Sequence, residues 1–329
     1  MRKLATVRKV IDIAPIPGAD AIECVTVDGW KVVSKKGEYQ IGGNALYLEV
    51  DSWVPEALAP FLCKDKREFN GVSGARLRTI KLRGQISQGL LLPVPEGASE
   101  GDDLTGMLGI QKYEAPIPAD LQGIMKGPFP SFVRKTNQER IQNLVAELEE
   151  WVDAGLEWEV TEKLDGSSLT AYLFQGEFGV CSRNLDLLET AGNSYWKLAR
   201  DHKLEQLLRA SGRNLAVQGE LIGPNVQGNP YGVGAPQLHV FDVYDIDQGR
   251  YLTSPERMAL LDGAGLLHCP VLGTQNLAGA SVASLLASAE AKSALKAGTE
   301  REGLVFKCLS ADVSFKVISN KFLLGEKAI

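Results

Sequence analysis

The chain has 329 residues, of which 44% are hydrophobic and 23% are charged, and its formal net charge at pH 7 is −6. This composition is typical of a soluble globular protein, and the negative charge excludes a global attraction to nucleic acid, so any nucleic-acid site must be a local patch. The length predicts two domains, each long enough for its own core.

The sequence carries no signal for a membrane or for an oxidising compartment. No run of about 18 apolar residues is present, so we expect no membrane span. The basic N-terminus lacks the apolar segment of a signal peptide. Five cysteines are scattered without a Cys-x-x-Cys pair, which fits a reducing cytoplasm and argues against a zinc site. We therefore expect a cytoplasmic protein with no membrane partner.

Residues 1–110 have the pattern of an all-β domain. Short apolar runs are separated by turns rich in Gly, Pro and Asp, and this spacing predicts a small barrel or sandwich. The expected strands are 6–13, 22–27, 30–33, 45–50 and 90–94.

A basic segment lies within this β domain. It carries four cations within eight residues: Arg76, Arg78, Lys81 and Arg83. One interpretation is a solvated edge strand that its charges keep soluble. The other is a strand of an oligonucleotide-binding (OB) barrel that contacts phosphates, which makes these four residues the candidate nucleic-acid contacts.

Residues 111–135 are rich in Pro and Gly and are predicted to be a linker. Thr136 and Glu139 then form a capping-box pattern, which predicts a helix with apolar residues on one face from Ile141 to Val152. Arg140 would lie in the first turn, off that face. A cation is unfavourable at a helix N-terminus, so Arg140 indicates an anionic partner, with a solvated arginine as the alternative.

Lys163-Leu-Asp-Gly-Ser167 is the most informative segment of the chain. Apolar residues alternate before it as in a half-buried strand, and a second strand-like run follows at 169–174. A lysine at the end of such a strand can act as a nucleophile once it loses its proton. The Lys-x-Asp-Gly pattern alone arises by chance in about one chain of this length in ten. Other motifs in the sequence must therefore distinguish a nucleophilic lysine from a solvated lysine on a surface hairpin.

The part of the chain that follows mixes strands and helices, which predicts an α+β domain with mostly antiparallel sheets. The expected helices are 194–210 and 282–297, and the expected strands are 215–221, 239–243, 303–309 and 313–318. Polar residues occur in these strand-like contexts in a definite order after Lys163. They are Arg183 in Ser-Arg-Asn, Glu220 in Gly-Glu, Phe241 in Phe-Asp, Glu302 in Glu-Gly-x-Val-x-Lys, and Lys316 in the last strand.

This ordered set resembles the nucleotidyltransferase motifs of the covalent ligase and capping-enzyme superfamily. DNA ligases and capping enzymes carry an OB domain after the last lysine motif, whereas here 13 residues follow Lys316 and the barrel candidate comes first. Together with the segment 129–143, this order resembles the bacterial, Deinococcus-type RNA ligase, often called RNA ligase 5. The resemblance implies an OB-like β-barrel (1–110), a linker (111–135) and an adenylyltransferase domain of ATP-grasp-like antiparallel sheets with helices (136–329).

The resemblance also implies a reaction, a cofactor and roles for individual residues. The expected function is an ATP-dependent RNA ligase that seals 3′-OH/5′-phosphate nicks through a lysyl-AMP intermediate, acting as a monomer on nicked RNA or RNA/DNA duplexes. Lys163 would carry the AMP. Glu220 and Arg183 would contact the ribose, Phe241 would stack on adenine, Lys316 would bind the α-phosphate and Arg140 would face the pyrophosphate. Glu162, Asp165, Gly166 and Glu302 complete the expected nucleotide site.

A divalent metal is expected because the attacking amine must be neutral. An unperturbed lysine is neutral in about one molecule in two thousand at pH 7, and a nearby cation lowers its pKa. Mg²⁺ (or Mn²⁺) prefers oxygen ligands, so Asp165, Glu220 and Glu302 are the candidate metal ligands.

The last strand departs from the superfamily pattern, and three alternative functions stay open. Many superfamily members carry Lys-x-Lys in the last strand, but here Ser314 and Ile318 flank Lys316. Either one lysine suffices, or Lys307 or Lys321 reaches the phosphate instead. The alternative functions are a DNA ligase, a capping-type guanylyltransferase, and a non-catalytic RNA-binding protein with a vestigial nucleotide pocket.

Overall fold

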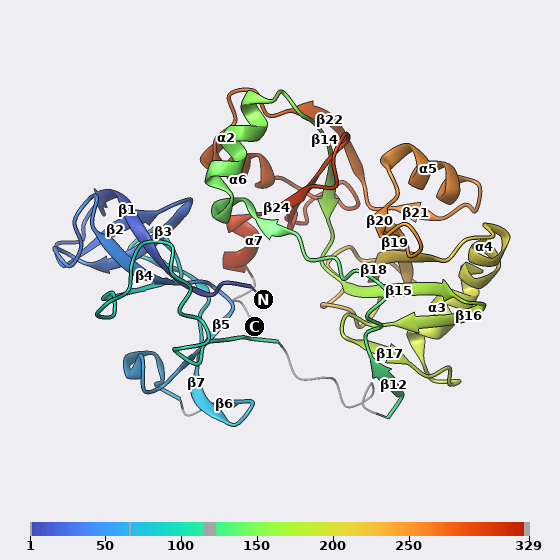
Figure 1. Cartoon of the computed structure of the whole chain (residues 1–329), viewed down its shortest axis with the longest axis horizontal. Coiled ribbons are helices and arrows are strands. Elements are labelled where there is room, and N and C mark those ends of the chain that lie inside the picture. The colour runs from blue at the N-terminus through green and yellow to red at the C-terminus, as the bar shows by residue number, and fades with distance from the viewer. Residues whose placement is uncertain (1, 66, 115–122, 326–329) are drawn as a thin grey trace. The chain divides into compact units, whose positions relative to one another are not determined.

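The structure, a computed structural model, describes residues 2–65, 67–114 and 123–325 (Figure 1). The chain divides into two compact units. Unit 1 comprises Met1–Pro116, Ile141–Val145 and Leu323–Ile329, and unit 2 comprises Ile117–Arg140 and Ala146–Phe322. Within the described ranges, no helix has the length and apolar character needed to cross a membrane.

Unit 1 is built from β-strands, as its sequence predicts. A five-stranded sheet has the order β10-β4-β1-β2-β3, a four-stranded sheet has the order β11-β5-β7-β6, and β8 and β9 form a hairpin. The strands are β1 (Ala5–Pro15), β2 (Ile22–Val27), β3 (Trp30–Lys35), β4 (Asn44–Leu48), β5 (Ser52–Pro55), β6 (Glu68–Phe69), β7 (Val72–Arg76), β8 (Thr79–Leu82), β9 (Gln85–Gln88), β10 (Leu90–Leu92) and β11 (Gln111–Lys112), with a 3₁₀ turn η1 (Pro60–Leu62) after β5.

The long strand β1 connects two apolar clusters of unit 1. Its first half pairs with β4, its second half pairs with β2, and a β-bulge lies between Val10 and Asp12. Val7 packs in a cluster with Leu46 and Leu48, whereas Val10 packs in a cluster with Trp30. The bulge bends the strand, so one strand contributes to both clusters.

The helix predicted to begin at Thr136 begins later, and this expectation was wrong. Residues Glu139–Arg140 form strand β13, Ile141–Asn143 form a 3₁₀ turn, η2, and helix α2 spans Val145–Asp153. The Thr136 hydroxyl donates to Gln218 Oε1 at 2.8 Å instead of capping a helix. A threonine satisfied by a distant strand leaves the capping pattern without effect.

Asn143, at the end of the 3₁₀ turn, anchors its segment within unit 1. Its Oδ1 accepts hydrogen bonds from Trp30 Nε1 (2.7 Å) and Arg8 Nη2 (3.0 Å), and its Nδ2 donates to Glu49 Oε2 at 3.0 Å. Trp30 and Glu49 are both fully buried. A buried indole N–H and carboxylate without partners would be costly, so Asn143 stabilises the core of unit 1.

Unit 2 contains two larger sheets. The first has the order β12-β17-β16-β15-β18-β19-β20, with β21 beside β19, and the second has the order β13-β24-β23-β14-β22. The remaining strands are β12 (Met125–Pro128), β14 (Glu157–Lys163), β15 (Ser167–Phe174), β16 (Glu177–Cys181), β17 (Leu185–Leu187), β18 (Leu215–Ile222), β19 (Gln237–Asp245), β20 (Arg250–Tyr251), β21 (Leu267–His268), β22 (Val271–Asn276), β23 (Gly303–Cys308) and β24 (Ser314–Ile318). The remaining helices are α3 (Ser194–Asp201), α4 (Leu204–Ala210), α5 (Ser254–Asp262), α6 (Val282–Ala289) and α7 (Asn320–Gly325).

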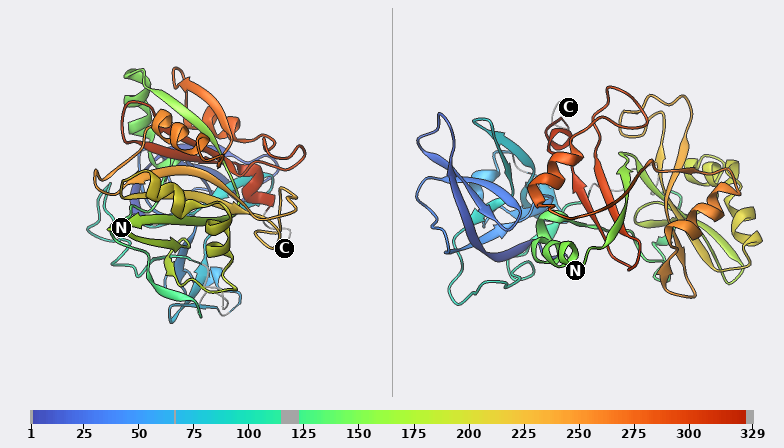
Figure 2. Two further views of the ribbon diagram at one scale, coloured as in Figure 1. Left: turned by 90° about the vertical axis from the view of Figure 1, so that its right-hand side faces the viewer. Right: turned by 90° about the horizontal axis from the view of Figure 1, so that it is seen from above.

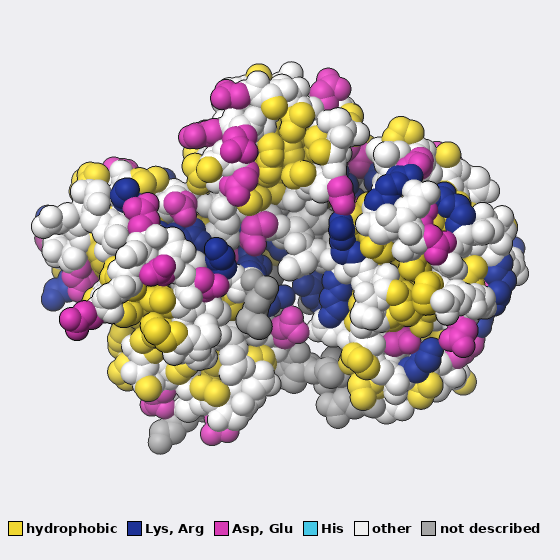
Figure 3. Space-filling model, viewed as in Figure 1, with side chains coloured by type: hydrophobic (Ala, Val, Ile, Leu, Met, Phe, Trp, Pro, Cys, Tyr) yellow, Lys and Arg dark blue, Asp and Glu magenta, His cyan; other side chains and the backbone are white. Residues whose placement is uncertain are grey.

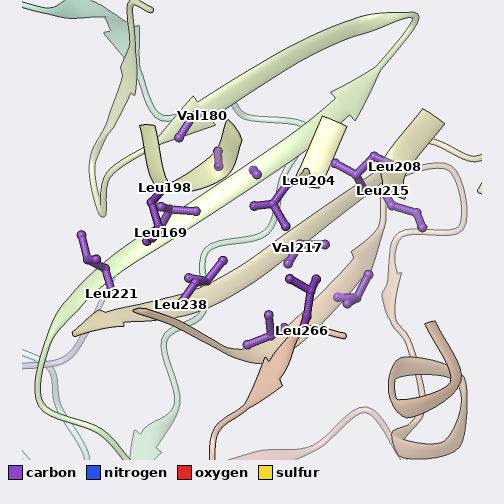
Figure 4. Close-up of a cluster of buried hydrophobic side chains, with 14 of the residues drawn as sticks. Leu169, Val180, Leu198, Leu204, Leu208, Leu215, Val217, Leu221, Leu238 and Leu266 are labelled. Atoms are coloured by element: carbon purple, nitrogen blue, oxygen red, sulfur yellow. The ribbon is translucent and has the colours of Figure 1, made fainter. Parts of the chain in front are cut away.

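Helices α3 and α4 cover one face of the first sheet (Figure 2). Alternate residues of β15, among them Leu169, point to this face and pack against Leu198, Leu204 and Leu208 of the helices (Figure 4). Strand alternation then directs Ser168, Thr170, Tyr172 and Phe174 to the opposite face. The sheet therefore presents one face to a helical layer and the other to the functional residues described below.

Three further expectations differ in detail from the structure. The helix predicted at 194–210 is two helices, because Lys203 between them adopts φ +52°. The helix predicted from 282 ends at Ala289. The predicted linker 111–135 contains strands β11 and β12, and its residues 115–122 lie outside the described part of the chain.

The buried leucines of α4 are expected to dominate the stability of unit 2. Leu204 is fully buried in the cluster of Figure 4, so Leu204→Ala should lower the free energy of unfolding by about 2–5 kcal/mol. Chemical denaturation measures this change. Leu188→Ala is the matched control, because Leu188 is 44% exposed and its truncation should cost less than about 0.5 kcal/mol. Equal losses in both variants would contradict the assigned core.

Candidate active site

The candidate site lies where the two sheets of unit 2 are joined. Strand β14 of the second sheet ends at Lys163, and strand β15 of the first sheet begins at Ser167, so the intervening turn connects the sheets. A pocket opens beside this turn. Its lining residues are Thr136, Asn137, Gln138, Thr161, Glu162, Lys163, Leu164, Ser168, Arg183, Glu220, Phe241, Cys269, Val305, Lys307 and Lys316.

Strand register brings Lys163 to Glu302. In the antiparallel pair of β14 and β23, Lys163 lies opposite Gly303, and Glu302 directly precedes that strand. Lys163 Nζ lies 2.7 Å from Glu302 Oε1, with the lysine side chain 30% exposed and the glutamate 14% exposed. An ion pair this shielded from water is stronger than a surface pair.

The charges around Lys163 favour its protonated form. Burial alone would lower the pKa of Lys163, but the carboxylates of Glu302, Glu220 and Asp165 outweigh it and raise that pKa above the ordinary lysine value. Burial raises the pKa of Glu220 to about 8, and the neighbouring carboxylates of Glu302 and Asp165 act in the same direction. The predicted carboxylates are therefore gathered around the predicted nucleophile.

The turn after Lys163 is fixed by close backbone approach and hydrogen bonds. A Cβ on Gly166 would clash with the Leu221 carbonyl oxygen and lie 2.9 Å from Glu220 Cγ, so this position requires glycine. The Asp165 backbone N–H donates to Tyr231 Oη at 2.7 Å. Glu162, which is buried, accepts a hydrogen bond from the Ala294 backbone N–H at 2.7 Å. These contacts hold Lys163 at the rim of the pocket.

Phe241 reaches the pocket through an irregularity of β19. Gln218 pairs with Asp242 and Gly219 pairs with Val240, so Phe241 is the extra residue of a β-bulge. It is half-buried between buried neighbours, and it packs beside Leu164 and Cys269. A bulge changes the direction in which a side chain points, and here the ring of Phe241 becomes part of the pocket wall.

Lys307 and Lys316 both line the pocket, whereas Lys321 does not. Lys307 Nζ is 2.7 Å from Asp242 Oδ1 and also donates to the Phe241 carbonyl oxygen. Lys321 forms an ion pair with Glu290 at 3.5 Å. Lys307 is thus the third lysine of the pocket, beside Lys163 and Lys316, and the Asp242 carboxylate already balances its charge.

Arg140 lies in a strand rather than in the first turn of a helix. Strand β13 runs parallel to β24, and Arg140 pairs there with Lys316. The arginine is 7% exposed, which excludes the solvated arginine considered from the sequence. Arg183, in contrast, is exposed at the pocket rim after β16.

The basic segment of unit 1 divides into two groups. Arg76 forms an ion pair with Asp51 at 2.6 Å and its guanidinium lies 4.8 Å from the Tyr113 ring centroid. Arg78, Lys81 and Arg83 are exposed on and around the β8–β9 hairpin, and no ion pair is recorded for them in the described part of the chain. In Figure 3, acidic side chains gather over helix α2, in keeping with the four acidic residues of that helix.

Sequence reasoning missed several residues of the pocket wall. Thr136, Asn137 and Gln138 line it from the segment before β13, and Ser168 lines it from the start of β15. Ser168 was predictable, because it is the second residue after the Lys-x-Asp-Gly turn and strand alternation fixes its face. The other three lie in an irregular segment whose position depends on contacts distant in sequence, such as Thr136 with Gln218.

Comparisons with known proteins decide the family. A family model described as RNA ligase matches residues 156–318. A solved structure of a Naegleria gruberi RNA ligase with pyrophosphate is 46% identical, covers 100% of this chain and 99% of its own, and has a TM-score of 0.91. The chain belongs to the RNA ligase family. A comparison with curated proteins gives no match.

Two further structures of that Naegleria ligase resemble this RNA ligase over its length. A mutant with ATP and manganese is 44% identical with a TM-score of 0.91, and a mutant with AMP and manganese is 45% identical with a TM-score of 0.92; each covers 98% of both chains. A family model described as an OB-fold domain matches residues 4–94. The predicted fold class, an OB-fold domain followed by a ligase domain, is confirmed.

Removing the Glu302 carboxylate should lower the pKa of Lys163. Glu302 is the first of the carboxylates that raise the pKa of Lys163, so Glu302→Gln should lower that pKa and increase the neutral fraction at a fixed pH above 7. Acylation of Lys163 by an amine-reactive reagent, followed by mass spectrometry across pH, should show a profile shifted to lower pH. The matched control is Glu300→Gln, because Glu300 pairs with Lys292 instead; an unshifted profile for Glu302→Gln would contradict the assigned electrostatics.

Proposed function

We propose that this RNA ligase joins a 3′-OH to a 5′-phosphate at a nick, using ATP and a divalent metal, through a lysyl-AMP intermediate on Lys163. The single observation that carries the proposal is the lysine at the rim of a pocket, ion-paired with Glu302 and close to Glu220 and Asp165. The Naegleria ligase structures with ATP, AMP, pyrophosphate and manganese support the choice of nucleotide and metal.

Three displacements at phosphorus would complete the reaction. The neutral Lys163 amine attacks the α-phosphorus of ATP, a P–N bond forms, the bond to the β-phosphate oxygen breaks, and pyrophosphate and a proton leave. An oxygen of the RNA 5′-phosphate then attacks the same phosphorus, and the P–N bond breaks. Finally the 3′-hydroxyl attacks the activated 5′-phosphorus, loses its proton and displaces AMP.

The carboxylates beside Lys163 fit a divalent metal. Glu302 Oε2 is buried and has no hydrogen-bond partner, and carboxylate oxygens suit Mg²⁺ and Mn²⁺. Among the described residues, no group of three or more His, Cys, Asp or Glu is arranged so that it could hold a metal ion by itself. We therefore assign Asp165, Glu220 and Glu302 as partial ligands, with phosphate and water oxygens supplying the rest. When bound, the metal would neutralise phosphate charge and lower the pKa of Lys163.

The pocket residues suit the parts of an adenine nucleotide. The half-buried ring of Phe241 can stack on the base, and Glu220 with exposed Arg183 can hold the ribose hydroxyls. Lys316 can bind the α-phosphate, and its register partner Arg140 can face the departing pyrophosphate. Glu162 and Gly166 would position Lys163 through the turn contacts described above.

Basic residues of unit 1 and the free cysteines bear on the RNA substrate and the cellular setting. Exposed Arg78, Lys81 and Arg83 can contact phosphates of a nicked RNA or RNA/DNA duplex, whereas Arg76 would first have to leave Asp51. The OB-fold match precedes the ligase match along the chain, which supports assignment to the Deinococcus-type group. The free cysteines support a reducing cytoplasm, where a monomer would repair broken RNA.

Covalent labelling tests the lysyl-AMP intermediate. After incubation with ATP labelled at the α-phosphate and magnesium, a denaturing gel should show labelled protein, and Lys163→Ala should lose the label because it lacks the attacking amine. Lys292→Ala is the matched control, since Lys292 pairs with Glu300 away from the pocket. Label that persists in Lys163→Ala would refute the intermediate, and label from GTP instead of ATP would indicate capping chemistry.

Nicked duplexes with RNA or DNA on the 3′-OH side test the substrate. Sealing should require RNA at that end, and salt should weaken binding, because phosphate contacts release counterions. Equal sealing of all-DNA nicks would overturn the RNA preference.

A further inference from the structure

A second cleft lies on the same sheet face as the lysine pocket. We call it the aromatic cleft; its lining residues are Lys126, Pro128, Pro130, Phe132, Tyr172, Phe174, Gln175, Glu177 and Asp186. Strand β15 connects the two sites, because Ser168 lines the lysine pocket while Tyr172 and Phe174 line the aromatic cleft.

Strand geometry gives the distance between the two sites. The register of β15 with both neighbouring strands is uninterrupted, so residues 168, 172 and 174 point to one face. At about 3.3 Å per residue, Tyr172 and Phe174 lie about 13 and 20 Å from Ser168 along the strand. A stacked nucleic-acid strand advances about 3.4 Å per nucleotide, so this span corresponds to about four to six nucleotides.

The walls of the cleft suit a flat aromatic ligand. Phe132 and Phe174 stack with ring centroids 4.2 Å apart, and Phe132 meets Tyr172 edge to face at 5.3 Å. Both phenylalanines are only half-buried, so parts of their rings face solvent. Prolines 128 and 130 add further apolar surface. Exposed aromatic rings of this kind bind unstacked nucleobases in single-strand-binding proteins.

Cations line the route between the two sites. Lys126 is 46% exposed and lies 3.4 Å from Asp186, which is buried and also accepts a hydrogen bond from Tyr172. The segment from Lys126 then continues through exposed Arg134 and Lys135 to Thr136, where the lysine pocket begins. A phosphate backbone following this segment would meet three cations between the cleft and the pocket.

Two exposed carboxylates oppose this route. Asp312 pairs with Arg134 at 2.6 Å, so a phosphate would have to compete with it for that arginine. Glu177 lies at the rim of the cleft and would repel a phosphate nearby. The carboxylate of buried Asp186 is instead balanced by Lys126 and accepts a hydrogen bond from Tyr172. The favourable path for a backbone therefore follows the Lys126 side of the cleft.

We propose that the aromatic cleft binds an unpaired nucleobase of an RNA strand whose reacting end lies at the Lys163 pocket. The bases of a duplex are stacked on one another and cannot enter between aromatic and proline side chains, so the ligand is single-stranded at this point. The ligase would then hold RNA ends that carry an unpaired stretch about four to six nucleotides from the join. This inference rests on the proposed function for the position of the reacting end.

Binding of short RNAs by the full-length protein tests the cleft. Fluorescence anisotropy with a labelled 12-nucleotide single-stranded RNA should show that Phe174→Leu weakens binding by about five- to a hundredfold, since stacking on one base contributes that much. Binding of a fully paired 12-base-pair RNA should change less than about twofold. Phe178→Leu is the matched control, because Phe178 packs on Trp196 at the opposite face of the sheet.

Two substitutions of opposite charge test the phosphate path. Lys126→Gln should weaken single-strand binding and reduce its salt dependence, whereas Glu177→Gln should strengthen it. Thermal unfolding of each variant separates lost binding from lost folding. Unchanged single-strand affinity in folded Phe174→Leu and Lys126→Gln, or an equal loss for duplex RNA, would overturn the proposal.

Covalent labelling by ATP distinguishes this proposal from the proposed function. Phe174→Leu should retain full labelling, because its side chain lies about 20 Å from the lysine pocket. Absence of label in the unaltered protein would refute the lysyl-AMP chemistry, whereas the RNA-binding results decide the cleft independently.

Discussion

The ion pair between Lys163 and Glu302 depends on the register of two antiparallel strands. Lys163 lies opposite Gly303, the residue directly after Glu302, and β14 is held in that register between β22 and β23. A slip of one residue would turn every side chain of β14 to the other face of its sheet. The chemistry of one amine is thus determined by backbone hydrogen bonds along a seven-residue strand.

The same carboxylates determine the protonation state of Lys163 in the absence of a nucleotide. They raise the pKa of Lys163, so the amine keeps its proton when no nucleotide is present. A metal ion that binds these carboxylate oxygens would compete with Lys163 for them. The neutral amine would then form when the nucleotide that it attacks is present.

The sequence predicted features that depend on local periodicity. Strand 22–27 matches β2 at both ends, because alternation and turn residues define it locally. The order of Lys163, Glu220 and Glu302 predicted that these side chains belong to one site, and they do lie together. Features that depend on distant contacts were not predictable. The capping-box pattern at Thr136 failed because Gln218, 82 residues away, binds its hydroxyl.

The sequence also carried no signal for two irregularities of the backbone. The bulge that turns Phe241 into the pocket adds one residue to β19 without any local Gly or Pro signal. Lys203 interrupts the helix predicted at 194–210 in a left-handed conformation that lysine rarely adopts. Both are results of packing within unit 2 rather than of intrinsic propensity.

The hydrogen bonds of Asn143 also affect how the protein can be divided. Residues 141–145 belong to unit 1, although both neighbouring segments belong to unit 2, so the two units are not consecutive pieces of chain. A fragment ending at residue 110 would retain Trp30 and Glu49, with Arg2 still paired to Glu49, but would lose the amide that hydrogen-bonds both. The N-terminal unit would therefore fold more stably when residues 141–145 are grafted onto it or supplied in trans.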